Sequence, residues 1–115
     1  MKVNITRTTE VKTSNTLDLT NGTASNRTYT ANFSKAWEIS RILIKFSTAQ
    51  SRNITITFND GTNDYPEKTE NADTSTAYAY TPTNCFGTSS DGLKIMFSQT
   101  GGACTATIKI IYRDA

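Results

Sequence analysis

The sequence predicts an all-β fold, a single jelly-roll-like β-sandwich of about seven to nine short, mostly antiparallel strands. Apolar and polar residues alternate at period two in several segments, and long helical patterns are absent. Threonine, a β-branched residue that suits a pleated surface, is the most abundant residue. Turn-forming pairs such as Asn21-Gly22, Asp60-Gly61 and Gly101-Gly102 separate these segments.

Length and composition indicate one globular domain. The chain has 115 residues, of which 36% are hydrophobic and 19% are charged, which supports one core. The net charge of +2 and the lack of Lys/Arg blocks argue against a nucleic-acid partner. No signal peptide is evident at Met1–Asn4, and no stretch approaches the roughly 18 apolar residues of a membrane span. We therefore expect synthesis in the cytoplasm and no membrane association.

Residues 1–36 are the most polar part of the chain, and two interpretations of them stay open. Alternation predicts a strand within Lys2–Lys12 and another around Tyr29–Phe33. The large apolar residues of this region are Val3, Ile5, Val11, Leu17, Leu19, Tyr29 and Phe33. Their wide spacing fits an extended arm that orders against a neighbouring subunit, and it also fits ordinary loops and edge strands.

Residues 37–115 are predicted to form the core of the sandwich. The segments Trp37–Phe46 and Asn53–Phe58 alternate most clearly, and Asn59–Thr62 closes the second as a hairpin turn. Polar connections are expected at Thr48–Arg52 and at residues 66–76. An edge strand at Tyr78–Pro82 and strands at 93–97 and 104–112 follow. The predicted core comprises Ile42, Ile44, Phe46, Ile54, Ile56, Phe58, Leu93, Ile95, Phe97, Ile108 and Ile110.

The residue types argue against an enzyme and against a cofactor. The chain contains no histidine, which excludes Ser-His-Asp triads, Cys-His dyads and most zinc sites. Glu38, Glu67 and Glu70 could serve a glycosidase only as two carboxylates across a cleft, and solvated surface charge explains them better. We therefore assign no catalytic, cofactor-binding or metal-binding residue.

The candidate metal ligands are Asp60, Asn63 and Asp64, whose oxygens suit Ca²⁺. Their spacing matches no known calcium loop, and a hairpin turn selects the same residue types. The turn is therefore the favoured interpretation of this cluster.

Cys85 and Cys104 are the only cysteines. Cys104 falls on the inward face of its predicted strand and Cys85 precedes the neighbouring one, so a disulfide between them stays open. The absence of a signal peptide favours reduced thiols.

Aromatic residues raise the possibility of a sugar-binding platform, because sugar rings stack on aromatic rings. The candidates are Trp37, Tyr29, Tyr65, Tyr78 and Tyr80. Tyr78 and Tyr80 at period two are explained more simply as half-buried strand residues, so packing in the core or in an interface is favoured.

The second two-thirds of the chain has a recognisable order of parts, which are Trp37–Ser47, Ser51–Asn59, Asp60–Tyr65, Tyr78–Pro82, Asp91–Phe97 and Ala103–Tyr112. This order resembles that of small virion proteins of tailed bacteriophages. The resemblance does not reach residues 1–36.

The resemblance implies a jelly-roll or sandwich domain that decorates a capsid or builds part of a tail, without enzymatic activity. It implies a location in the virion after synthesis in the bacterial host. The implied partners are further copies of the chain, with a trimer as the candidate state, and another virion protein. The alternative is a carbohydrate- or receptor-binding module of the adhesin or fibre-tip type.

Overall fold

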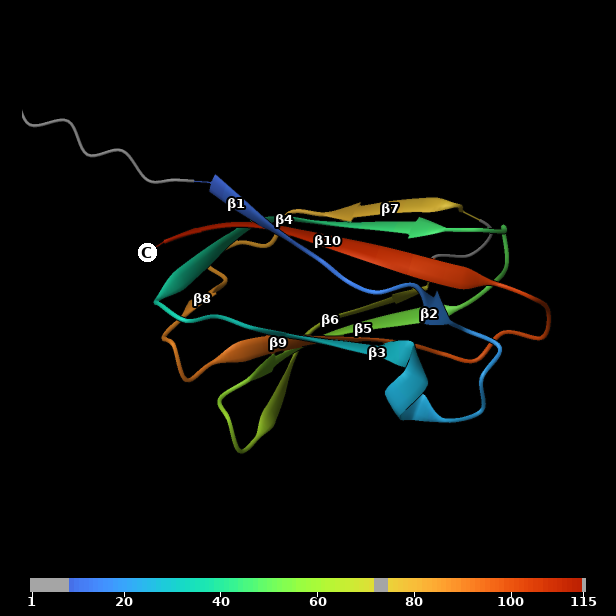
Figure 1. The fold of residues 1–115 in the computed structure, drawn as a ribbon, viewed down its shortest axis with the longest axis horizontal. Coiled ribbons are helices and arrows are strands. Elements are labelled where there is room, and N and C mark those ends of the chain that lie inside the picture. The colour runs from blue at the N-terminus through green and yellow to red at the C-terminus, as the bar shows by residue number, and fades with distance from the viewer. Residues whose placement is uncertain (1–8, 72–74, 115) are drawn as a thin grey trace, which may run out of the picture.

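The computed structural model describes residues 9–71 and 75–114 and contains two antiparallel sheets packed face to face (Figure 1). The predicted all-β sandwich is confirmed. The described residues form ten strands and one 3-10 turn, η1 (Ala24–Arg27). The count exceeds the expected seven to nine because β2 and β8 have two residues each, too few to give a periodic signal.

The first layer, called sheet A, has the strand order β1-β10-β4-β7. Its strands are β1 (Thr9–Thr13), β10 (Thr105–Asp114), β4 (Trp37–Phe46) and β7 (Ala77–Tyr80), with β2 (Leu17–Asp18) beside β10 and β8 (Phe86–Gly87) beside β4. Cross-strand pairs place Ile44 of β4 between Ile108 of β10 and Tyr78 of β7. The two longest strands thus form the centre of sheet A, and β7 is one of its edges.

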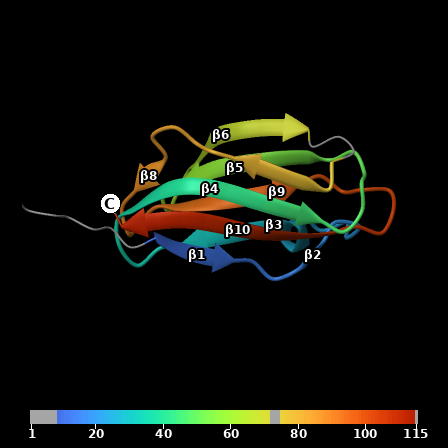
Figure 2. The ribbon, with the colours of Figure 1, turned by 90° about the horizontal axis from the view of Figure 1, so that it is seen from above.

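The second layer, called sheet B, has the order β3-β9-β5-β6. Its strands are β3 (Thr28–Asn32), β9 (Gly92–Phe97), β5 (Asn53–Asn59) and β6 (Asp64–Asn71). Seen from above sheet A, β6 extends beyond the β7 edge (Figure 2). Sheet B therefore reaches further than sheet A on this side of the sandwich.

The core lies between the two sheets and contains the residues that alternation predicts. All the predicted core residues are buried except Phe58, which is partly buried. Leu19, Ala31 and Phe33 join the same core from the N-terminal third of the chain. The predicted strand at Lys2–Lys12 is described only from Thr9, where β1 begins, and its earlier residues lie outside the described part.

One predicted polar connection is wrong, and the other is confirmed with one unexpected burial. Most of the expected loop at residues 66–76 is strand β6, which pairs with β5 along its length. In the expected turn Thr48–Arg52, the last residue is buried, with 1% of its surface exposed. Strand β6 was missed because a polar segment at the edge of a sheet carries no apolar alternation.

Candidate interaction surface

The free edge of β7 is an unprotected strand edge with an apolar groove beside it. Among the described strands, β7 pairs only with β4. Its sequence is Ala-Tyr-Ala-Tyr, without charge, proline or a bulge. The edge of sheet B on the same side differs, because β6 contains Pro66, a register shift against β5 and charged residues. Proline, register shifts and charged residues in an edge strand discourage the addition of another strand, and β7 has none of these features.

The backbone groups that point to the free side belong to Ala77 and Ala79. The amide of Phe46 donates to the carbonyl of Thr76 at 2.9 Å, so Thr76 faces β4. In an antiparallel ladder the hydrogen-bonding direction alternates from residue to residue. The register with β4 therefore turns Tyr78 and Tyr80 toward β4, and the amides and carbonyls of the two alanines away from it.

An apolar groove of about 340 Å³ lies beside this edge on the outer face of sheet A. Leu43 of β4 stands opposite Ala79, and Lys45 stands opposite Ala77. Thr107 and Lys109 of β10 border the groove on the far side. Because the alanine side chains are short, the groove opens toward the free edge of β7.

The rim of the groove is positively charged. Lys45 and Lys109 are exposed, as is Arg41 further along β4. The described residues hold no carboxylate within ion-pair distance of these three cations, whereas Arg113 on the same face binds Glu38 at 2.9 Å. The groove and its rim therefore offer apolar contact flanked by uncompensated positive charge.

The inner side of the β7 edge is closed by contacts to β6. The hydroxyl of Tyr78 donates to Glu70, and the Lys68 ammonium lies 5.9 Å from the centre of the Tyr80 ring. Burial and the neighbouring carboxylate raise the pKa of Tyr78 above its usual value. These tyrosines thus seal the flank of the core beneath the edge strand.

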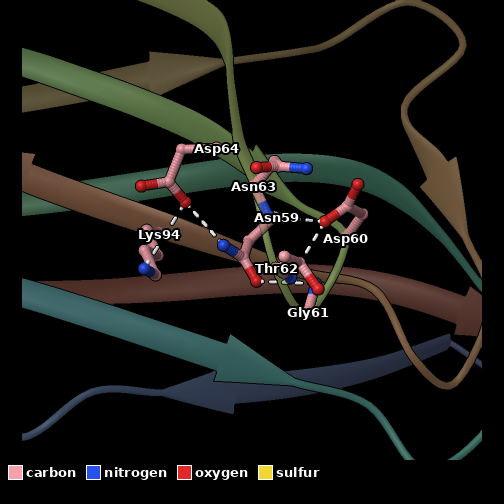
Figure 3. A network of polar contacts seen from close by, with 7 residues as sticks. All are labelled: Asn59, Asp60, Gly61, Thr62, Asn63, Asp64 and Lys94. Carbon is pink, nitrogen blue, oxygen red and sulfur yellow. Dashed lines mark hydrogen bonds and ion pairs between the residues drawn. The ribbon is translucent and has the colours of Figure 1, made fainter.

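The candidate metal ligands at Asp60, Asn63 and Asp64 belong to the β5–β6 hairpin turn, in which Gly61 has a φ of 93° (Figure 3). Asp60 accepts the amides of Thr62 at 2.9 Å and Asn63 at 2.6 Å. Asp64 accepts the Asn59 side-chain amide and lies 3.4 Å from Lys94. These hydrogen bonds lower the pKa of both carboxyl groups. Asp60 and Asp64 thus stabilise the hairpin turn that the favoured interpretation predicts.

The three glutamates considered for glycosidase chemistry have separate partners. Glu38 binds Arg113, and Glu70 accepts from Tyr78. Glu67 lies near Tyr80, whose pKa is raised by burial and by that carboxylate. Within residues 9–71 and 75–114, no group of three or more acidic, Cys or His side chains is placed to hold a metal ion.

The disulfide that the sequence left open does not form. Cys85 and Cys104 are both buried and both free. The Cys85 carbonyl accepts from Ile39 near the start of β4, whereas Cys104 precedes the part of β10 that pairs with Phe46 at its end. Seven strand residues span roughly 23 Å, far beyond the roughly 7 Å that a disulfide bridges between Cα atoms. Burial raises the pKa of the Cys85 thiol to about 12, which keeps it protonated and unreactive.

We therefore expect reductant and EDTA to leave the melting temperature of the protein unchanged. Thermal unfolding followed by circular dichroism, with and without each reagent, checks this. A large fall with EDTA would instead implicate Asp60 and Asp64 in metal binding.

The aromatic residues considered as a sugar platform do not gather on one surface. Trp37 is fully buried, and Tyr78 and Tyr80 pack against the core. Tyr29 also packs against the core, while Tyr65 is exposed near Phe58. An aromatic residue that the sequence analysis missed, Phe86, is 60% exposed and lines a second pocket of about 340 Å³. A two-residue strand such as β8 gives no alternation from which this exposure could be predicted.

None of the helices in the described residues has the length and apolar character required to cross a membrane.

Comparison with known proteins identifies a fold but no family. No family model matches the chain. No curated protein matches it. Among solved structures, the nucleoplasmin-like N-terminal domain of Drosophila FKBP39 is similar over 99% of this chain and 95% of that domain, with a TM-score of 0.50 and 10% identity. At this identity the similarity shows the sandwich fold alone.

Two similarities to viral structures are more distant. One is to the Gx strain of infectious bursal disease virus, with a TM-score of 0.43 and 16% identity over 93% of this chain and 33% of that one. The other is to the virus-like particle of extra small virus from the prawn Macrobrachium rosenbergii, with a TM-score of 0.38 and 12% identity over 100% of this chain and 84% of that one. The chain thus has a distant, jelly-roll-like resemblance to proteins of viral particles, which carries no functional argument.

Proposed function

We propose that this chain is a non-enzymatic structural protein of a bacteriophage virion, a capsid decoration protein or another head- or tail-associated component that acts through protein–protein contacts. The resemblance of its sequence layout to small phage virion proteins supports the setting. The observation that carries the proposal is the β7 edge, where unprotected backbone groups lie beside an apolar groove. Such an edge can bind a partner by strand addition.

The proposal includes self-association, with a trimer as the candidate state. The support is the resemblance to small virion proteins. Residues 9–36 add none, because β1, β2 and β3 pair within this chain and Leu19 and Phe33 lie in its core. Static light scattering of the purified chain over a range of concentrations measures the oligomeric state. A mass of one chain at every concentration would contradict this part of the proposal.

A substitution at the free edge tests the function directly. Ala79→Pro removes an amide that points away from β4, so the β4–β7 ladder keeps its hydrogen bonds. The variant loses that donor and carries a proline ring at the edge. Its binding to capsids encoded by the same genome, measured by co-sedimentation, should therefore be weaker by about tenfold. The matched control is Ala79→Ser, which retains the amide and should bind like the original chain.

Thermal unfolding of both variants must accompany the binding assay, so that a folding defect is not mistaken for lost contact. Equal capsid binding by the two variants at equal stability would contradict a role for the β7 edge. Absence of capsid binding by the unaltered chain would contradict the virion proposal itself.

A second candidate function, glycan or receptor binding, is favoured by the pocket beside Phe86. There an exposed aromatic ring lies near the Glu38–Arg113 ion pair and Asn84, a combination of stacking surface and planar polar groups that suits a sugar. If this function holds, calorimetry against a glycan panel should give binding that Phe86→Ala abolishes while Tyr65→Ala leaves it unchanged. Binding that ignores Phe86, or none to any glycan, would contradict it.

A further inference from the structure

We propose that the β7 edge accepts an extended segment of a partner protein that carries an acidic residue and a bulky apolar residue two positions apart on one face. The inference rests on the proposed function and specifies the chemistry of the partner. It follows from three features of the described residues. They are the open position beside β7, the β4 side chains in register with that position, and the positive charge around the groove.

The position beside β7 can be occupied by one more strand of sheet A. Strand β6 of sheet B already extends beyond the β7 edge and lies beneath this position (Figure 2). The amides and carbonyls of Ala77 and Ala79 point toward it. An added strand would therefore pair with β7 on one side and pack over the inner face of β6.

The cross-strand register assigns a neighbour to each outward position of the added strand. A residue opposite Ala77 lies in line with Lys45, and a residue opposite Ala79 lies in line with Leu43. Strands lie about 4.8 Å apart, so each of these positions is about 10 Å from the corresponding β4 backbone, which two facing side chains span across a short alanine. The register thus selects an acidic residue opposite Ala77 and a bulky apolar residue opposite Ala79.

The surrounding charge favours a partner of opposite sign over a second copy of this chain. Pairing β7 with its own copy places alanine methyl groups beside both lysines and supplies no carboxylate. The N-terminal segment offers Val3, Ile5 and Arg7 at period two, which puts a cation where the register selects an anion. Exposed Lys45, Lys109 and Arg41 would remain uncompensated in either arrangement.

The test is an NMR titration of the ¹⁵N-labelled full chain with capped nine-residue peptides. In each peptide every second residue is threonine, so that threonine occupies one face of the extended strand. The first peptide carries valine and glutamate at two successive positions of the other face, and its counterpart carries valine and lysine. We expect the glutamate peptide to shift the amides of Ala77 and Ala79 most, and to bind about threefold more tightly than the lysine peptide.

Charge reversal at one residue then decides the inference. Lys45→Glu should invert the preference, so that the lysine peptide binds more tightly, because the pair that sets the preference has been reversed. Lys35→Glu is the matched control, since Lys35 is also exposed but lies in the connection between β3 and β4. This control should keep the original preference.

Three outcomes of the titration would overturn the inference. They are an unchanged preference in Lys45→Glu, shifts confined to residues away from β7, and no shift with either peptide at millimolar concentration. Self-association abolished by Ala79→Pro would also overturn it, by identifying a second copy as the occupant. If Ala79→Pro abolishes capsid binding while Lys45→Glu leaves the peptide preference unchanged, the proposed function stands and only the partner chemistry is wrong.

Discussion

Replacing Trp37 with alanine is expected to lower the free energy of unfolding by about 3–5 kcal/mol, the range for large aromatic residues in a core. Trp37 is fully buried, and its ring stacks on Phe33 with centroids 4.6 Å apart. Its indole nitrogen donates to the carbonyls of Thr88 at 3.0 Å and Asp91 at 3.3 Å. Alanine would leave a cavity and remove the indole donor from both carbonyls, of which that of Thr88 still accepts from the Asp91 amide at 3.1 Å. Urea unfolding followed by fluorescence of the tyrosines and by circular dichroism measures the loss.

The conservative variant Trp37→Phe separates packing from hydrogen bonding. Phenylalanine fills most of the volume but cannot donate, so a smaller loss of about 1–2 kcal/mol is expected. Gly87 belongs to the same contact, because a Cβ atom there would lie 2.6 Å from the Trp37 ring. A loss below about 1 kcal/mol in Trp37→Ala would contradict the assignment of this ring to the core.

Replacing Arg52 with alanine is expected to cost about 3–4 kcal/mol of unfolding free energy, from lost packing and lost charged hydrogen bonds. The Arg52 guanidinium lies 4.0 Å from the centre of the Phe46 ring. It donates to the carbonyls of Ser75 at 3.1 Å and Thr48 at 2.8 Å. These bonds connect the β4–β5 turn to the residues that lead into β7. Hydrogen exchange of the β7 amides should therefore accelerate in the variant.

The matched variant Arg52→Met decides whether the buried charge contributes net stability. Methionine retains much of the side-chain volume but removes the charged donor from both carbonyls, so a loss of about 2 kcal/mol is expected. The Arg52 Nε atom is buried without a hydrogen-bond partner, which already reduces what the charge contributes. If Arg52→Met is as stable as the original chain, desolvation of the guanidinium cancels its hydrogen bonds.

Alternation predicted the central strands correctly because they are buried on one face only. In β4, Ile42 and Ile44 point to the core while Leu43 and Lys45 point outward, so the sequence itself carries the pattern. The edge position of Tyr78–Pro82 was also predicted, because proline ends a ladder. What alternation cannot give is which strands become neighbours. The groove depends on the register between β4 and β7, two segments separated by more than thirty residues.

Strand β6 was mispredicted, and the burial of Arg52 was not predicted, for reasons that lie in the tertiary structure. The inner face of β6 carries Lys68 and Glu70. These side chains contact the tyrosines of β7 instead of contributing apolar groups to the core. Arg52 is buried against the Phe46 ring, and it donates both to the nearby Thr48 carbonyl and to the Ser75 carbonyl, which lies 23 residues further along the chain. Neither environment can be derived from local composition, since each forms only when both sheets are assembled.

The position of β10 has a consequence for how the protein is made. This strand pairs with β1, β2 and β4, yet it is formed by residues 105–114. During translation sheet A therefore cannot be completed until those residues leave the ribosome. Until then β1 lacks its partner, and β4 can pair only with β7 and β8 on its other side. Such non-local pairing folds slowly, on a scale of roughly milliseconds to seconds, and unpaired strand edges associate with other chains in the meantime. The soluble yield of this protein is thus set by a competition between late closure around β10 and aggregation, and slower synthesis at low temperature should favour closure.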